Sequence, residues 1–264
     1  YTLDHHGEEY KHLENPAKRA QYGEFFGKGD GYYVVSHLDL DSVLTIAGLE
    51  GIRVDNELID IVSKIDIHGA HSVDWTKSRY ANFLKAFWDS LQGLRFSDGQ
   101  DVTELVEKLL ELVKKAEKLA DVPELTAKVR AWDAEIERAK QGVVRVEKVQ
   151  IKDSDGVNEV KVGLAKSDSP AGFEGFYRKA DIVVAYNPKF KKVTIALKTD
   201  NLVTLFGEKG LLELVPELDA EFGAGWGGRP TIIGSPRDKA IDEEVVDKIY
   251  EKILNFLQNK WRIK

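Results

Sequence analysis

The sequence contains no cysteine, and this absence excludes disulfide bonds and metal sites built from thiolates. No apolar run approaches the roughly 20 residues that a membrane-spanning helix needs, and no signal-peptide pattern is present. With 31% charged residues and a net charge of −7, the chain lacks the excess positive charge typical of nucleic-acid coats and polybasic membrane anchors. We therefore expect a soluble cytoplasmic protein that binds neither membranes nor long nucleic acids.

The length of 264 residues and a hydrophobic content of 42% favour two domains. The first part of the chain alternates strand-like and helix-like patterns. The expected elements are a strand at residues 32–36 and helices at 42–49, 56–64 and 76–91. This alternation predicts an α/β domain over residues 1–100, with a parallel sheet covered by helices.

The remainder of the chain changes character twice. Residues 101–141 are rich in Glu, Lys, Leu and Ala and predict a helical hairpin connector, with Pro123 at a helix start. Residues 142–264 predict a smaller α+β domain with a mixed sheet, beginning with a β-hairpin that turns at residues 153–156. An amphipathic helix at 242–261 is expected to end the chain.

Histidine is concentrated in one part of the sequence. All six histidines fall within the first 71 residues: His5, His6, His12, His37, His68 and His71. Aspartates accompany them, among them Asp4 beside His5, and Asp66 beside His68. Histidine and carboxylate without sulfur form a ligand set suited to Mn, Mg, Fe or Zn. We expect His12 and His71 to lie at the surface or in an outer shell.

The spacing around Asp39 is consistent with a metal site. His37, Asp39 and Asp41 alternate with apolar residues, so they share one side wherever the backbone is extended. They also follow the expected strand at 32–36, and open α/β sheets bind ligands at the carboxyl ends of strands. Carboxylates packed together repel, and divalent cations relieve that repulsion. The alternatives are structural: Asp41-Ser42 as a helix N-cap, and Asp4-His5-His6 as a surface turn.

Asp4-His5-His6-Gly7 resembles the signature of the DHH phosphoesterase superfamily. The stretch from His37 through Asp39 to Asp41-Ser42 resembles that family's first metal motif. The resemblance implies two Mn²⁺ ions, with Mg²⁺ as the other candidate, in an α/β domain followed by a smaller substrate domain. It implies that Asp4, His5, His37, Asp39 and Asp41 are metal ligands, that Asp66 bridges the ions, and that His6 lies beside the leaving oxygen.

A glycine-rich stretch, GAGWGGRPTIIGSPR at residues 223–237, resembles the substrate loop of the family's second domain. Its glycines let backbone N–H groups approach an anion, and Arg229 and Arg237 can clamp phosphate oxygens. We expect Gly227, Gly228, Arg229 and Arg237 to bind substrate. Two features differ from the usual pattern: the metal motif normally precedes the DHH motif, and the loop normally carries a histidine where this chain has Arg229-Pro230.

These features predict a metal-dependent hydrolase of a phosphoester or phosphoanhydride, with a small phosphorylated, nucleotide-like substrate. His6 and Arg229 are the predicted catalytic residues, and His68 joins the predicted metal ligands through its place beside Asp66. The alternative is a metal- or nucleotide-binding protein of the same fold without turnover. Methionine is absent as well as cysteine, which leaves open an engineered chain with an idle site. The oligomeric state is also open, a homodimer included.

Overall fold

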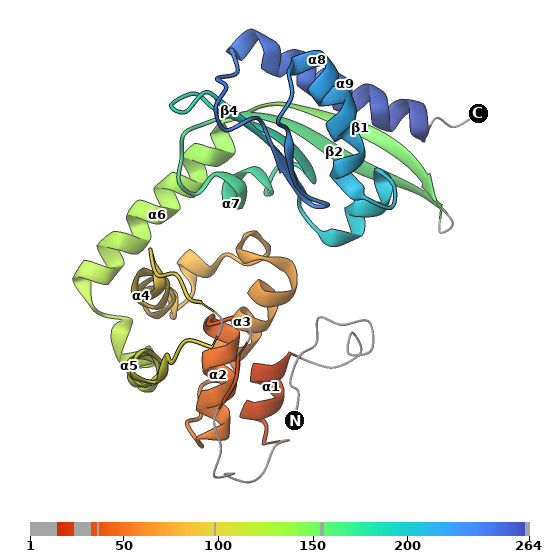
Figure 1. Cartoon of the computed structure of the whole chain (residues 1–264). Coiled ribbons are helices and arrows are strands. Elements are labelled where there is room, and N and C mark those ends of the chain that lie inside the picture. Colours follow the sequence, from red (N-terminus) through yellow and green to blue (C-terminus); the bar gives the residue numbers. More distant parts are fainter. Residues whose placement is uncertain (1–14, 24–32, 36, 98, 154–155, 262–264) are drawn as a thin grey trace. The chain divides into compact units, whose positions relative to one another are not determined.

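A computed structural model describes residues 15–23, 33–35, 37–97, 99–153 and 156–261 of the chain. The chain divides into two compact units, Tyr1–Trp132 and Asp133–Lys264. The boundary falls inside one helix, α6 (Pro123–Gln141) (Figure 1). The protein belongs to the mixed α/β class, as predicted, and the second unit contains all of the strands found among the described residues.

The described part of the first unit is helical. Its helices are α1 (Pro16–Gln21), α2 (Leu40–Leu49), α3 (Asn56–His68), α4 (Ala81–Leu91) and α5 (Thr103–Lys114), with short 3-10 helices at Ala70–Ser72, Trp75–Lys77 and Ala116–Leu119. The apolar faces of these helices meet in one core that includes Leu44, Leu58, Trp75, Phe83 and Leu109. Burial of each such side chain contributes roughly 1.5–3 kcal/mol, so this core stabilises the unit without a sheet.

Local signals explain where α3 begins and ends. The Asp55 side chain caps the helix by accepting a hydrogen bond from the backbone N–H of Glu57 at 2.8 Å. Leu58, Ile59 and Val62 then form the buried stripe expected from their spacing. Gly69, with φ of +81°, follows the last helical residue because glycine adopts this backbone conformation without strain. The helix predicted at residues 56–64 is therefore confirmed and extends to His68.

The parallel sheet expected in the N-terminal domain does not occur in the described part of residues 1–100. Residues 33–35, the described part of the expected strand, form neither helix nor strand. Tyr33 and Val34 are 48% and 91% exposed, so this apolar run is not a buried strand. The apolar stripes of α2, α3 and α4 pack on one another instead, and stripe spacing alone cannot tell a helical neighbour from a sheet.

The segment 101–141 is helical as predicted, and α6 begins at Pro123. Its two helices differ in their packing. Leu109 and Val113 of α5 are buried in the core of the first unit. Ile136 and Ala139 of α6 are fully buried on the other side of the unit boundary, where Ala139 packs with Phe176. The helices of this segment therefore contribute apolar side chains to both cores.

The second unit is built on a six-stranded mixed sheet of order β1-β2-β3-β4-β6-β5. The strands are β1 (Val143–Asp153), β2 (Gly156–Lys166), β3 (Ile182–Asn187), β4 (Lys192–Leu197), β5 (Gly227–Arg229) and β6 (Ile232–Gly234). Among these described strands, only β2 and β3 pair in parallel, and the remaining neighbours are antiparallel. The predicted mixed sheet and its opening hairpin are confirmed, whereas β5 and β6 lie in the stretch predicted as a loop.

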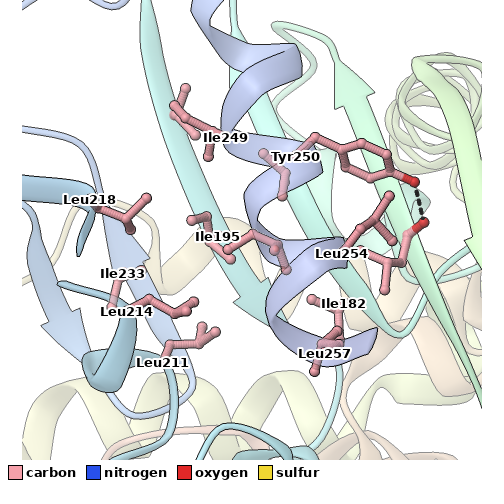
Figure 2. Packing of buried hydrophobic residues seen from close by; sticks show 14 of the residues in the cluster. Ile182, Ile195, Leu211, Leu214, Leu218, Ile233, Ile249, Tyr250, Leu254 and Leu257 are labelled. Atoms are coloured by element: carbon pink, nitrogen blue, oxygen red, sulfur yellow. Dashed lines mark hydrogen bonds between the residues drawn. The ribbon is translucent and has the colours of Figure 1, made fainter. Parts of the chain in front are cut away.

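A long C-terminal helix, α9 (Glu243–Lys260), covers one face of this sheet (Figure 2). Ile249, Leu254 and Leu257 pack against Ile182 and Ile195 of the sheet in the largest apolar cluster of the described residues. The buried Tyr250 hydroxyl donates a hydrogen bond to the carbonyl of Val162 at 2.8 Å. The predicted helix at 242–261 is thus confirmed, and its apolar stripe is the side that meets the sheet.

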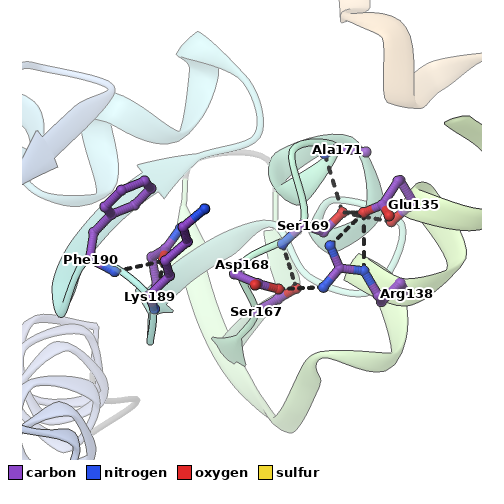
Figure 3. A network of polar contacts seen from close by, with 9 residues as sticks. Glu135, Arg138, Ser167, Asp168, Ser169, Ala171, Lys189 and Phe190 are labelled. Carbon is purple, nitrogen blue, oxygen red and sulfur yellow. Dashed lines mark hydrogen bonds and ion pairs between the residues drawn. The ribbon is translucent and has the colours of Figure 1, made fainter.

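The opposite face is covered in part by α7 (Gly172–Phe176) and the end of α6. Ser169, just before α7, donates its hydroxyl to the carbonyl of Glu135 at 2.8 Å, and Arg138 forms ion pairs with Glu135 and Asp168 (Figure 3). Gly175 has no side chain because a Cβ there would lie 2.5 Å from the Cβ of Ala139. These contacts fix α7 against α6.

The element α8 (Val215–Phe222) and two 3-10 helices, Asp200–Leu205 and Gly210–Leu214, complete the second unit. Among the described residues, no helix has the length and apolarity required to span a bilayer.

Candidate functional site

Three of the predicted site residues, Asp4, His5 and His6, lie outside the described residues. The other predicted metal ligands are described, and four of them lie near the start of α2 or the end of α3. They are Asp39, Asp41, Asp66 and His68, with His37 two residues before the helix cap.

Asp39 is the N-cap of α2. Its Oδ1 accepts a hydrogen bond from the backbone N–H of Ser42 at 2.9 Å, and the backbone N–H of Asp39 donates to the Ser42 hydroxyl at 3.0 Å. This reciprocal pair is a capping box. The helix N-cap considered for Asp41-Ser42 therefore exists, but Asp39 forms it. Because α2 begins at Leu40, the three ligands do not lie on one extended strand as expected.

Asp41 and Asp66 are brought together around one amide side chain. Asn15 donates from Nδ2 to Oδ2 of Asp66 at 3.0 Å, and its side chain also hydrogen-bonds Asp41. The backbone N–H of Ala17 donates to Oδ1 of Asp41 at 3.3 Å. We call Asn15, Asp41 and Asp66 the carboxylate pair site. Two of the predicted metal ligands, Asp41 and Asp66, therefore lie near each other, and α2 and α3 supply them rather than strand ends.

The electrostatics of this site are unfavourable for two full negative charges. Burial, together with the nearby charges of Asp66 and Asp39, raises the pKa of the Asp41 carboxyl from its ordinary value of 3.8 to about 7. The hydrogen bonds from Asn15 and Ala17 lower it without offsetting those effects. Among the described residues, no lysine or arginine forms an ion pair with Asp41. The site therefore favours a proton or a cation near Asp41 at neutral pH.

The placement of Asn15 depends on how α1 packs against α2. Gln21, buried at the end of α1, donates to the carbonyls of Leu44 and Ile52 and accepts from the N–H of Val54, each at 3.1 Å. Gly48 allows the two helices to touch, because a Cβ there would lie 2.8 Å from the carbonyl carbon of Ala20. A network of buried hydrogen bonds thus holds α1 in one position on α2.

Sequence reasoning missed Asn15, although a signal was present. Asn15 is the N-cap of α1, accepting from the N–H of Lys18 at 3.3 Å, and Pro16 occupies the first helical position. Asparagine followed by proline is a typical helix start. The contact between Asn15 and Asp66 could not be found in this way, because 51 residues separate them in the chain.

The described histidines do not join this pair. His37 and His68 are exposed, and His68 is the last residue of α3, where a basic side chain suits the negative end of the helix dipole. Within the described ranges, no group of three or more histidines, cysteines, aspartates or glutamates is arranged to hold a metal ion. The part of the site built by described residues is therefore the two carboxylates with Asn15.

The glycine-rich stretch of the second unit differs from the expected anion-binding loop. The backbone N–H groups of Gly225 and Trp226 both donate to Oδ1 of Asp219, at 2.9 and 3.0 Å. Gly228 has φ of +156°, and a Cβ there would lie 2.2 Å from the carbonyl oxygen of Ile232. Gly228 therefore allows the close pairing of β5 with β6, and the N–H groups of Gly225 and Trp226 are already bound to Asp219.

The two predicted phosphate-binding arginines are also separated. Arg229 pairs with Ile232 at the start of β6, whereas Arg237 follows Gly234 at the end of that strand. Both arginines are exposed, and neither forms an ion pair with another described residue. Each guanidinium can bind an anion, but they lie toward opposite ends of β6 and do not form one clamp.

Comparison of the chain with protein-family models, with curated proteins and with solved structures gave no match. The resemblance to the DHH phosphoesterase superfamily therefore depends on the motif residues alone.

Proposed function

We propose that the chain is a metal-dependent hydrolase of a phosphoester or phosphoanhydride in a small, nucleotide-like substrate. The observation that carries this proposal is the meeting of Asp41 and Asp66 around the side chain of Asn15. A protein under selection for stability alone gains nothing from placing two partly buried carboxylates together, since each opposes ionisation of the other. Such pairs are typical of sites that hold a divalent cation.

The residues of the carboxylate pair site fit a hard cation. Carboxylate oxygens are the ligands that Mn²⁺ and Mg²⁺ prefer. The raised pKa of Asp41 means that a bound cation would stabilise the ionised form of this carboxyl. Asp41 and Asp66 would hold the ions, with Asp39 near Asp41 and with Asp4 and His5 as the remaining candidates. Two divalent cations, when bound, lower the pKa of a water ligand and neutralise charge on phosphate oxygens.

The connection to the DHH motif is short enough for this arrangement. His6 lies nine residues before Asn15, and nine extended residues span at most about 30 Å. Asn15 is itself in contact with Asp66, so the chain enters the described part of the first unit at the carboxylate pair site. His6 then remains the candidate that gives a proton to the leaving oxygen.

Roles for the arginines follow from their exposure. Arg229 and Arg237 each present an exposed guanidinium, a group that binds phosphate oxygens with paired N–H donors. Because they lie toward opposite ends of β6, we expect only one of them, Arg229 by the motif, to contact the reacting phosphate. Loss of Arg237 should then affect substrate affinity less than loss of Arg229.

The test compares three aspartate variants by Mn²⁺ titration calorimetry and by phosphate release from nucleotides, dinucleotides, pyrophosphate and sugar phosphates. Asp39→Asn keeps an N-cap, because asparagine caps helices as well as aspartate does. We expect Asp39→Asn and Asp41→Asn to lose both Mn²⁺ binding and hydrolysis. Asp60→Asn, on an exposed position of α3, makes the same charge change away from the pair and should retain both.

The outcomes separate the candidate functions. Hydrolysis that persists in Asp41→Asn contradicts the metal role of this residue. Stoichiometric Mn²⁺ binding that Asp41→Asn removes, without phosphate release from any substrate by the wild-type protein, favours the metal-binding protein without turnover.

A further inference from the structure

The outer edge of β1 is long and unpaired by any other described strand. β1 has 11 residues and stands at one end of the sheet order, with β2 as its only partner among the described strands. The strand at the other end, β5, has three residues. Sheets usually end in short or protected strands, because alternate N–H and C=O groups of an edge strand point away from the sheet and can pair with another chain.

Apolar side chains lie on this edge. Val144 and Val146 are 58% and 40% exposed, which is unusual for two valines so close together. The residue directly opposite Val146 on β2 is Gly163, which provides no side chain to cover it. On the other face, Arg145 forms ion pairs with Glu147 at 3.2 Å and with Glu251 of α9 at 2.5 Å.

We propose that β1 pairs in antiparallel fashion with β1 of a second copy of this chain, about a two-fold axis at Val146, so that the two sheets join into one. In this register Arg145 of each copy lies opposite Glu147 of the other. The two arginines and two glutamates then alternate in sign on one face of the joined sheet. On the other face the two Val146 side chains meet and lose their contact with water.

Charge selects this register over its neighbours. An axis at Arg145, at Glu147 or at Lys148 places each of these residues opposite its own copy. Like charges directly opposite each other destabilise a strand pair, whereas opposite charges stabilise it by roughly 0.2–1 kcal/mol per pair. The axis at Val146 puts an apolar residue on the symmetry axis and an opposite charge on each side of it. An isologous interface of this kind also closes, so it gives a dimer and not a filament.

The first experiment is sedimentation equilibrium of the full chain over a range of concentrations. We expect a concentration-dependent dimer for the wild type and for the control variant Phe190→Lys, which places a lysine at an exposed apolar position of the β3–β4 turn. Val146→Lys sets two like charges on the axis and should be monomeric at every concentration. Circular dichroism checks that both variants keep the wild-type fold.

A second experiment uses the absence of native cysteine. Val146→Cys places one thiol on the axis, where opposite Cα atoms in an antiparallel pair lie about 4.5–5.5 Å apart, within disulfide reach. Mild oxidation should convert this variant to a covalent dimer, and Phe190→Cys should stay uncrosslinked.

Three results overturn the proposal. They are a wild type that is monomeric throughout, a dimer that survives Val146→Lys unchanged, and equal crosslinking of the two cysteine variants. In the first case, β1 amides that resist hydrogen exchange at the outer edge would show that the same chain covers that edge.

Discussion

The amide nitrogen Nδ2 of Asn15 donates a hydrogen bond to Oδ2 of Asp66 at 3.0 Å, joining the start of α1 to the last turns of α3. The same side chain hydrogen-bonds Asp41 in the first turn of α2. The buried side chain of Asn15 therefore connects α1 to α2 through Asp41 and to α3 through Asp66. The hydrogen bonds from Asn15 stabilise the ionised carboxylates only in part. The pKa of Asp41 is still raised, so the ionised form of this carboxyl remains unfavourable.

The stability of the metal-free protein should fall as the pH rises from about 4 to 7. In this interval the unfolded chain has released the Asp41 proton, since the ordinary pKa is 3.8, while the folded chain still holds it at a pKa of about 7. Folding then requires proton uptake, so the free energy of unfolding falls by up to about 1.4 kcal/mol per pH unit, on the order of 4 kcal/mol in all. Urea titrations in EDTA across this range measure it.

Asp41→Asn should remove this pH dependence and raise the stability of the metal-free protein at pH 8. The neutral amide has no charge to bury beside Asp66, so the variant should gain on the order of 1–3 kcal/mol over the wild type at that pH. Addition of Mn²⁺ should reverse the order of the two proteins, because only the wild type keeps the carboxylate. A variant less stable than the wild type in EDTA at pH 8 would contradict the proposed repulsion.

Gly48→Ala should disturb the position of α1. The new Cβ would lie 2.8 Å from the carbonyl carbon of Ala20, so the helices must move apart. We expect a loss of about 1–2 kcal/mol, because overpacking of about 1–3 kcal/mol is partly offset by the better helix propensity of alanine. Mn²⁺ affinity should fall with it, since Asn15 moves.

The matched control for Gly48→Ala is Gly175→Ala in the second unit, where a Cβ would lie even closer to its neighbours, 2.5 Å from the Cβ of Ala139. This control should also lower stability in urea but leave Mn²⁺ affinity unchanged. Equal losses of affinity in both variants would mean that unfolding, and not the placement of Asn15, limits metal binding.

Asp219→Ala should loosen the glycine-rich stretch. The carboxylate of Asp219 is the acceptor for two backbone N–H groups, those of Gly225 and Trp226, and their loss costs about 1–3 kcal/mol. Hydrogen exchange at these two amides should become faster. Asp238→Ala, an exposed position after β6 with no such hydrogen bond, should leave the exchange rates as they are.

Tyr250→Phe should destabilise the second unit by about 1–3 kcal/mol, because the carbonyl of Val162 loses its buried donor. Thermal unfolding of the variant measures this loss. Tyr22→Phe removes a hydroxyl from a side chain that is 51% exposed, so it should change stability by less than about 0.5 kcal/mol. A loss in Tyr250→Phe no larger than in Tyr22→Phe would show that water replaces the donor.

Several elements could be predicted from the residues alone. The start of α6 at Pro123, the cap of α3 at Asp55, the hairpin of β1 and β2 and the apolar stripe of α9 all match their sequence signals. Each depends on residues within a few positions of one another, through φ restriction, capping or side-chain period. Such local preferences act whatever the rest of the chain does.

Other features depend on contacts between distant segments. The described helices of the first unit pack on one another and not on a sheet, and Gly228 lies in a close strand pair, because the partners of these residues lie elsewhere in the chain. Spacing indicated that Asp41 was a candidate ligand, and the family resemblance added Asp66. Only the packing of α1, α2 and α3 decided that they meet around Asn15, since a charge pair is defined by distance in space and sequence patterns record only order along the chain.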